Sequence, residues 1–419
     1  MTVLAVVAGA LPFSGYVCLD SLDAPDVEGA SEVSQHEDVP DAPLPNRPGD
    51  ITAAQMKDIA FIAEERGITL EEAIAEIGWQ ESFAQLATVI ANEFPEEYAG
   101  ARIEQDGLPW IAFKGDVPPG AMTMLDGFER GVFSRSEYQL ASGEERRVLV
   151  REGRGFTEAE LAEQVVEAYF AVLDQRDLVA DASAGYDIET GEVTVLVEWV
   201  NPKTADIRVA MVTELRNRSP HLDGVDLEMV KSVGTGDDAS IYGGDAMSGC
   251  TSGFTVRTSS TRGIATAAHC SDVQYMYEWL HFVNAHHGTW GDVQWHTSTS
   301  YEYDDFWSGN SQDYDVNLRD VNARGNAVEG QSLCRNGKTT YKECDTVYQL
   351  NHCSSGVCHL TAMHNDEASG GDSGGPWFYG NTAYGIHQGY KWWWFKSRDL
   401  FTPQQYIDDG MPGVTVATT

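Results

Sequence analysis

A serine near the C-terminal end of the chain is surrounded by glycines. Residues 371–376 read Gly-Asp-Ser-Gly-Gly-Pro, with Ser373 as the serine. A nucleophile on a tight turn lets nearby backbone N–H groups face an oxygen that gains negative charge, and glycine permits this close approach. Roughly a hundred residues upstream, His269 precedes Cys270, and imidazole is a suitable base for a serine hydroxyl. Either motif alone also fits a structural role, but together they predict nucleophilic serine chemistry.

Such chemistry needs a third group that orients the histidine and stabilises its charged form. Asp292 opens an apparent strand 23 residues after His269, and Asp315 begins another plausible strand. Asp304 and Asp305 lie in a polar segment and are expected in solvent. We favour Asp292 on its spacing and keep Asp315 as the alternative.

The region that carries these residues has the composition of a β protein. From residue 241 onward Gly, Ser, Thr, Trp and Tyr are frequent, and segments are short. This pattern predicts an all-β barrel or sandwich. Six of the seven cysteines lie in this region and no CxxC pair occurs, which favours three disulfides in an oxidising compartment over a zinc site.

The first half has a different texture. Residues 19–49 are rich in Asp, Glu, Pro and Ser and are expected to be an acidic linker. Apolar residues at helical spacing then predict a helix that ends at Gly67, and Thr69 is a plausible cap of a second short helix. Thr157 and Glu160 form a capping-box pattern before another amphipathic helix.

Residues 186–200 alternate around Thr190-Gly191 and predict a hairpin. Residues 50–240 are therefore expected to be α+β, in two subdomains. Nothing in the first half combines a nucleophile, a base and an oxyanion site. We therefore interpret the first half as a helper of the second half.

Charge and the N-terminus bear on location. The formal charge is −38, and residues 1–240 hold 46 Asp and Glu against 17 Lys and Arg. This acidity argues against binding to nucleic acid or to anionic membranes. Residues 1–18 contain a short apolar run that suggests a secretory signal, with Cys18 as a less favoured lipid-attachment site. No segment is long and apolar enough to span a membrane.

Residues 241–419 resemble the bacterial branch of the chymotrypsin family, which includes the streptogrisins and α-lytic protease. Residues 241–244 (Ile-Tyr-Gly-Gly) resemble the mature N-terminus of that family, and residues 250–254 and 334–340 resemble two further blocks. The resemblance implies two antiparallel β-barrels with the active site in the cleft between them. Residues 50–240 resemble the pro-regions of the same proteases, which assist folding and then inhibit the enzyme until they are cut away.

The resemblance also implies roles for single residues. It implies that the N–H groups of Gly371 and Ser373 form the oxyanion hole, and that Arg335 pairs with Asp372. It implies the disulfides Cys250–Cys270 and Cys334–Cys344, which leave Cys353–Cys358 as the third pair.

The substrate pocket departs from the resemblance. Gln388 stands where relatives carry a small residue, and Tyr390 where they carry glycine. His387 falls where some members of the family bind a glutamate side chain. It is either a determinant of acidic specificity or a structural histidine.

The sequence thus predicts a secreted serine endopeptidase, made as a zymogen, that acts on polypeptides through His269, Asp292 and Ser373 without a metal or other cofactor. Its pro-region is an expected partner, and the boundary is expected at Ser240–Ile241. The alternative is a catalytically impaired binding protein on a protease scaffold, which the changes at Gln388 and Tyr390 would allow.

Overall fold

The computed structural model describes residues 50–419 except 140–145, 176, 200–214, 217, 220–221, 223, 231–234, 237–244, 277, 299–302, 310–316 and 394–395. The expected signal segment at 1–18, the linker at 19–49, the boundary at Ser240–Ile241 and the alternative acid Asp315 all lie outside the described residues.

The longer helices in the described part of the first half include three whose starts follow from local sequence. They are α1 (Ala53–Arg66), α2 (Leu70–Ile77), α3 (Gln80–Glu93), α4 (Pro119–Phe128) and α5 (Glu158–Leu173). Thr52, Thr69 and Thr157 each accept a backbone N–H at the start of a helix and complete a capping box. Gly67 ends α1 with a φ of 65°, a left-handed conformation that favours glycine. The predicted helix ends and caps are confirmed.

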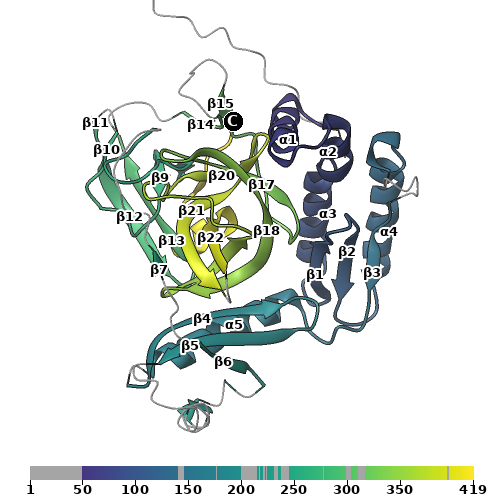
Figure 1. Cartoon of the computed structure of the whole chain (residues 1–419), viewed down its shortest axis with the longest axis horizontal. Coiled ribbons are helices and arrows are strands. Elements are labelled where there is room, and N and C mark those ends of the chain that lie inside the picture. Colours follow the sequence, from purple (N-terminus) through teal and green to yellow (C-terminus); the bar gives the residue numbers. More distant parts are fainter. Residues whose placement is uncertain are drawn as a thin grey trace, which may run out of the picture. The chain divides into compact units, whose positions relative to one another are not determined.

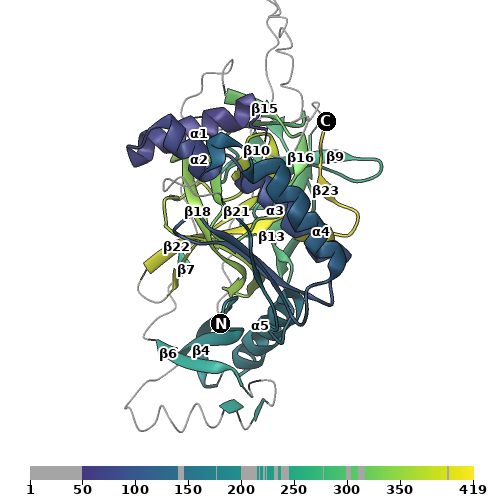
Figure 2. The same ribbon diagram turned by 90° about the vertical axis from the view of Figure 1, so that its right-hand side faces the viewer.

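One small sheet accompanies these helices, together with three strands that continue the large sheet of the second half. The small sheet has the order β1-β2-β3, formed by β1 (Tyr98–Ile103), β2 (Pro109–Phe113) and β3 (Leu149–Arg151). The predicted hairpin is present as β4 (Val179–Asp187) and β5 (Glu192–Trp199), but its first strand begins earlier than expected from the alternation. Strand β6 (Asp226–Val230) pairs with β5, and α5 packs along β4 (Figures 1 and 2).

The second half is built mainly of strands, which confirms the predicted fold class. Six of them close into a ring through β17–β18 pairing: β17 (Ser332–Gly337), β20 (Pro376–Tyr379), β21 (Thr382–Trp393), β22 (Lys396–Pro403), β19 (Val357–Met363) and β18 (Tyr341–Ser354). Five more form a sheet in the order β12 (His281–Gly288), β13 (Gly291–Thr297), β9 (Arg262–Thr266), β8 (Thr255–Arg257) and β23 (Thr415–Val416). Figure 1 shows the ring in yellow-green beside the teal strands β9, β12 and β13.

Shorter elements complete this half. They are β10 (Tyr275–Met276), β11 (Glu278–Trp279), β14 (Asp305–Trp307), β15 (Leu318–Asp320), β16 (Ala323–Arg324) and the final helix α8 (Ile407–Gly410).

The two halves share strands and core. The hairpin of β18 and β19 extends into the first half, because Cys353 and Ser354 pair with residues of β4. Strand β7 (Thr235–Gly236) pairs with β21. Buried Ile59 and Ile62 of α1 belong to the same hydrophobic cluster as the barrel core, whereas α3 with β1 and β2, and α5 with β4 and β5, lie in two other clusters.

Candidate active site

Three segments of the second half bring together the residues singled out in the sequence. His269 follows β9, Asp292 lies in β13, and Ser373 occupies the turn before β20. The Nε2 atom of His269 is 2.9 Å from Ser373 Oγ, and its Nδ1 is 2.5 Å from Asp292 Oδ2. The three side chains therefore form one continuous chain of hydrogen bonds.

Asp292 is held so that its carboxylate faces the imidazole. It is fully buried, and its second oxygen accepts the backbone N–H of His269 at 3.0 Å. The backbone N–H of Asp292 donates to Thr402 Oγ1 at 2.8 Å. Thr402 on β22 thus links β13 to the ring, a role that no local feature of the sequence indicates.

Two hydrogen bonds fix peptide planes in the turn around Ser373. The carbonyl of Gly370 accepts Thr339 Oγ1–H at 2.7 Å, and the carbonyl of Asp372 accepts the N–H of Gly375 at 2.9 Å. In a trans peptide the N–H points opposite to the C=O. Both contacts therefore direct the N–H groups of Gly371 and Ser373 away from the hydrogen-bonded side of the turn.

A buried ion pair supports the same turn. Arg335 and Asp372 are both fully buried, with Nη1 and Oδ2 3.3 Å apart. The Asp372 carboxylate also accepts bonds from Ser369, Thr339 and Thr340. Burial alone would raise the pKa of Asp372, but the Arg335 charge and these hydrogen bonds hold it below its usual value. Asp372 is therefore a fixed anion that anchors the nucleophile turn.

Three disulfides are present: Cys250–Cys270, Cys334–Cys344 and Cys353–Cys358. The first ties the segment that carries His269 to the strand region before β8. The third lies in the hairpin that reaches the first half.

The expected pocket residues lie on β21 beside the nucleophile. The carbonyl oxygen of Gln388 is 3.4 Å from Ser373 Oγ. His387 is fully buried, and its Nδ1 accepts the indole N–H of Trp377 at 3.4 Å. That contact places the proton of a neutral ring on Nε2. Tyr390 is partly exposed, and its backbone pairs with Gly236 of β7.

Strand β7 of the first half therefore pairs with β21, the strand that carries these residues. The sequence did not indicate this contact. Among the described residues, no cluster of three or more His, Cys, Asp or Glu side chains is arranged to hold a metal ion. Nor does the described part of the chain contain a helix long and apolar enough to cross a bilayer.

Comparison with curated proteins gives a consistent group of relatives. The chain is 28% identical to serine protease 1 of Streptomyces fradiae over 241 residues, which cover 54% of this chain and 63% of that protein. It is 29% identical to glutamyl endopeptidase 2 of Streptomyces griseus, covering 36% and 82% of the two chains. It is 30% identical to serine protease 2 of Streptomyces fradiae, covering 33% and 86%.

Among solved structures, protease A of Thermobifida fusca matches 43% of this chain and 100% of its own, at 27% identity and a TM-score of 0.36. No protein-family model matches the sequence. The chain spans somewhat less than two thirds of the length of serine protease 1. The coverage and identity of the match to serine protease 2, together with the joined His269, Asp292 and Ser373, place this chain in the bacterial chymotrypsin-like serine protease family.

Proposed function

We propose that the protein is a secreted serine endopeptidase made as a zymogen. The observation that carries the proposal is the unbroken series from Asp292 through His269 to Ser373, with contacts of 2.5 and 2.9 Å. Ser373 Oγ attacks the carbonyl carbon of a peptide bond while His269 Nε2 takes its proton. The same proton passes to the leaving amine, and water then hydrolyses the acyl-enzyme by the reverse sequence.

The negative oxygen of each tetrahedral intermediate is bound by the N–H groups of Gly371 and Ser373. The hydrogen bonds that fix the peptide planes on either side of Asp372 support this role, because donors that are already oriented need no rearrangement during the reaction. The buried Arg335–Asp372 pair keeps the turn in place.

Residues 50–240 act as a pro-region. In this proposal β7 lies as an antiparallel strand on β21, where Tyr390 and Lys391 pair with Gly236 and Thr235. Because Gln388 of the same strand reaches Ser373, a chain bound along β21 competes with a substrate for that edge. Cleavage near Ser240–Ile241 would release the edge. Pairing of β4 with β18 would also assist folding, since it provides a template for a barrel with many non-local strand contacts.

Export is supported by the three disulfides, which persist in oxidising compartments. The substrates are polypeptides, as the names of the relatives indicate. Glutamyl endopeptidase 2 is one of these relatives, and its name together with the position of His387 beside the nucleophile supports a preference for an acidic residue before the cleaved bond.

A fluorophosphonate probe tests the catalytic proposal. Ser373 of the processed protein is expected to be labelled covalently, and Ser373→Ala is expected to remain unlabelled while keeping the fold, because only the nucleophile is lost. Mass spectrometry of the labelled peptide identifies the residue. Absence of labelling in processed protein would favour the alternative, a binding protein on a protease scaffold.

A further inference from the structure

A buried carboxylate joins the first helix to the protease barrel. Asp58 of α1 has no exposed surface, and it receives four hydrogen bonds from the second half. Arg319 binds it with both terminal nitrogens, Nη1 to Oδ2 at 2.8 Å and Nη2 to Oδ1 at 2.9 Å. Lys342 Nζ lies 2.6 Å from Oδ1, and the backbone N–H of Gly380 donates to Oδ2 at 2.7 Å.

The donors form a built site rather than a chance surface contact. The side chains of Arg319 and Lys342 are only 6% and 5% exposed. Arg319 also donates to the carbonyl of Gly380 at 3.1 Å, which fixes the guanidinium. Burial alone would raise the pKa of Asp58, but the two cations hold it below its usual value, so the group is an anion.

The residues around Asp58 allow α1 to pack closely against the barrel. Gly380 has a φ of 60°, and a Cβ there would lie 2.6 Å from Gln55 Cγ, so glycine allows α1 to approach closely. Phe61, one turn along α1, places its ring 4.7 Å from Lys342 Nζ. Ile59 and Ile62 enter the barrel core beside this contact. Charge and apolar contacts therefore come from the same helix face.

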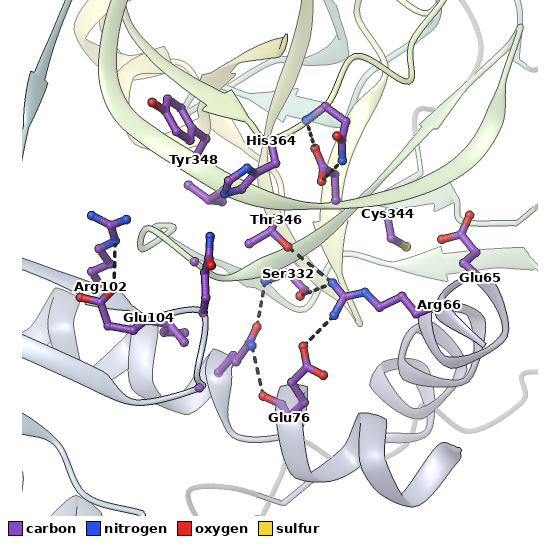
Figure 3. Close-up of a pocket in the computed structure, with 18 of the residues that line it drawn as sticks. Glu65, Arg66, Glu76, Arg102, Glu104, Ser332, Cys344, Thr346, Tyr348 and His364 are labelled. Atoms are coloured by element: carbon purple, nitrogen blue, oxygen red, sulfur yellow. Dashed lines mark hydrogen bonds and ion pairs between the residues drawn. The ribbon is translucent and has the colours of Figure 1, made fainter. Parts of the chain in front are cut away.

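A cavity lined by polar residues lies beside this contact. It has a volume of about 710 Å³ and lies between α1, α2, β1 and strand β18 (Figure 3). At its rim Arg66 pairs with Glu76 of α2, whereas its contacts to Ser332 and Thr346 of the barrel are 3.5 Å long (Figure 3). Ion pairs that are exposed to solvent in this way contribute little to the stability of a contact. Asp58 is thus the strong polar contact of α1.

We propose that Arg319, Lys342 and the Gly380 N–H form a carboxylate-binding site of the protease domain, and that this site retains the cut pro-region through Asp58. The inference rests on the proposed function, because it assumes that residues 50–240 are separated from the domain by cleavage. When the pro-region leaves, two cations less than 4 Å from one carboxylate lose their common counter-ion. Removing one partner of a buried charged contact costs far more than removing an exposed one.

The test uses the full chain with Ser373→Ala and a site for an added, specific protease inserted between residues 240 and 241. After the cut, size-exclusion chromatography and a dilution series measure how tightly the two pieces remain bound. Asp58→Asn, which keeps the size of the side chain, is expected to weaken retention by about thirtyfold or more. Glu64→Gln, a change of the same charge at an exposed position of α1, is expected to leave retention within twofold.

A double variant guards against misfolding of Asp58→Asn. Asp58→Asn combined with Lys342→Gln is expected to lose less than the sum of the single changes, because the two residues share one contact. Pieces with Asp58 intact that separate at once would overturn the proposed retention, whereas the pro-region proposal itself would fail only if active protein were never cut between the two halves. Wild-type pieces that stay bound, with Asp58→Asn bound equally well or with losses that simply add, would overturn only the Asp58 site.

Discussion

At the scale of residues, His269 is oriented by two hydrogen bonds to the same carboxylate. Asp292 accepts both its ring Nδ1–H and its backbone N–H, so the imidazole and its loop are oriented by one carboxylate. An amide at position 292 can donate to Nδ1 and thereby stabilise the tautomer that protonates Nε2, which then cannot act as the base.

Asp292→Asn is therefore expected to lower kcat at neutral pH by about four orders of magnitude with little loss of stability. Steady-state hydrolysis of a peptide ester or amide, with thermal unfolding measured alongside, checks this. Asp315→Asn is the matched comparison. If that change were the crippling one and Asp292→Asn kept most of the activity, the assignment of the acid would be wrong.

His387 supports a prediction of specificity. A neutral ring whose Nδ1 accepts from Trp377 carries its proton on Nε2, and the prediction is that a substrate carboxylate that reaches this buried ring accepts a hydrogen bond from it. A charge-assisted bond of this kind is expected to favour Glu over Gln before the cleaved bond by about ten- to a hundredfold.

Matched peptides that differ only at that position, measured with wild type and His387→Ala, test the prediction. A second charge lies nearby, because buried Asp399 is opposite Tyr390 in the register of β21 and β22, where its carboxylate accepts the backbone N–H of Glu367 at 3.2 Å. A preference for Lys or Arg that survives His387→Ala and disappears in Asp399→Asn would contradict the acidic pocket.

The candidate catalytic side chains could be selected from the sequence because their motifs are local. The groups that hold them could not. Thr402 meets Asp292 across 110 positions, and Thr339 meets Gly370 across 31. Asp58 could have been noticed as a charge close to the apolar positions Ile59 and Ile62, but its partners Arg319 and Lys342 are more than 250 residues away.

At the scale of elements, local signals predicted the helices better than the strands. Three capping boxes and the left-handed Gly67 mark helix ends through contacts within four residues. Strand β4 begins at Val179, seven residues before the alternation became visible at Tyr186. Much of β4 is buried on both faces between α5 and its neighbours, which removes the alternation of polar and apolar residues.

The contact between β1 and the loop before β17 predicts that the stability of the folded chain depends on pH. Glu329, in the loop before β17, is 4% exposed and lies 4.0 Å from Arg102 of β1. Burial raises the pKa of Glu329 to about 8. The charges of Glu158 and Asp187 also raise this pKa, whereas the charge of Arg102 lowers it. Burial likewise raises the pKa of Glu158 to about 7, against the effect of its hydrogen bond with Tyr186.

Both carboxyls bind protons more tightly in the folded chain than in the unfolded one, where the pKa is near 4.5. Their contribution to stability is complete below about pH 4.5 and is lost as the pH rises through 7 to 8. Glu329→Gln in the Ser373→Ala precursor is therefore expected to raise Tm above pH 8 and to flatten its decline. Parallel curves for wild type, Glu329→Gln and the exposed control Glu163→Gln between pH 5 and 9 would contradict the prediction.

At the scale of the whole molecule, the described residues of the first half contact the second half at several places, among them the contacts of α3 with Ser332 and Tyr384 and of Arg102 with Glu329. Helix α1 enters the barrel core, β4 extends the ring through β18, and β7 lies on β21 near the nucleophile. The sequence predicted a helper of α+β type, but it could not show how that helper is joined, because strand pairing between distant segments leaves no periodic signal in either of them.

These contacts suggest how the precursor matures. A chain that carries its own nucleophile beside a bound strand is expected to cut itself near Ser240–Ile241, and β7 then becomes a product-like segment that is free to leave. Wild-type protein is expected to yield two pieces, whereas Ser373→Ala is expected to stay at full length. N-terminal sequencing of the C-terminal piece checks the boundary, and a start far from Ile241 would contradict it.

Mixing a trace of processed wild type with Ser373→Ala distinguishes cleavage between molecules from cleavage within one molecule. Cutting whose rate rises with the added enzyme is intermolecular, while a wild-type rate that does not change on dilution is intramolecular. The pairing of β7 with β21 of the same chain favours the second result, because a segment tethered to its own nucleophile has an effective concentration that does not fall on dilution.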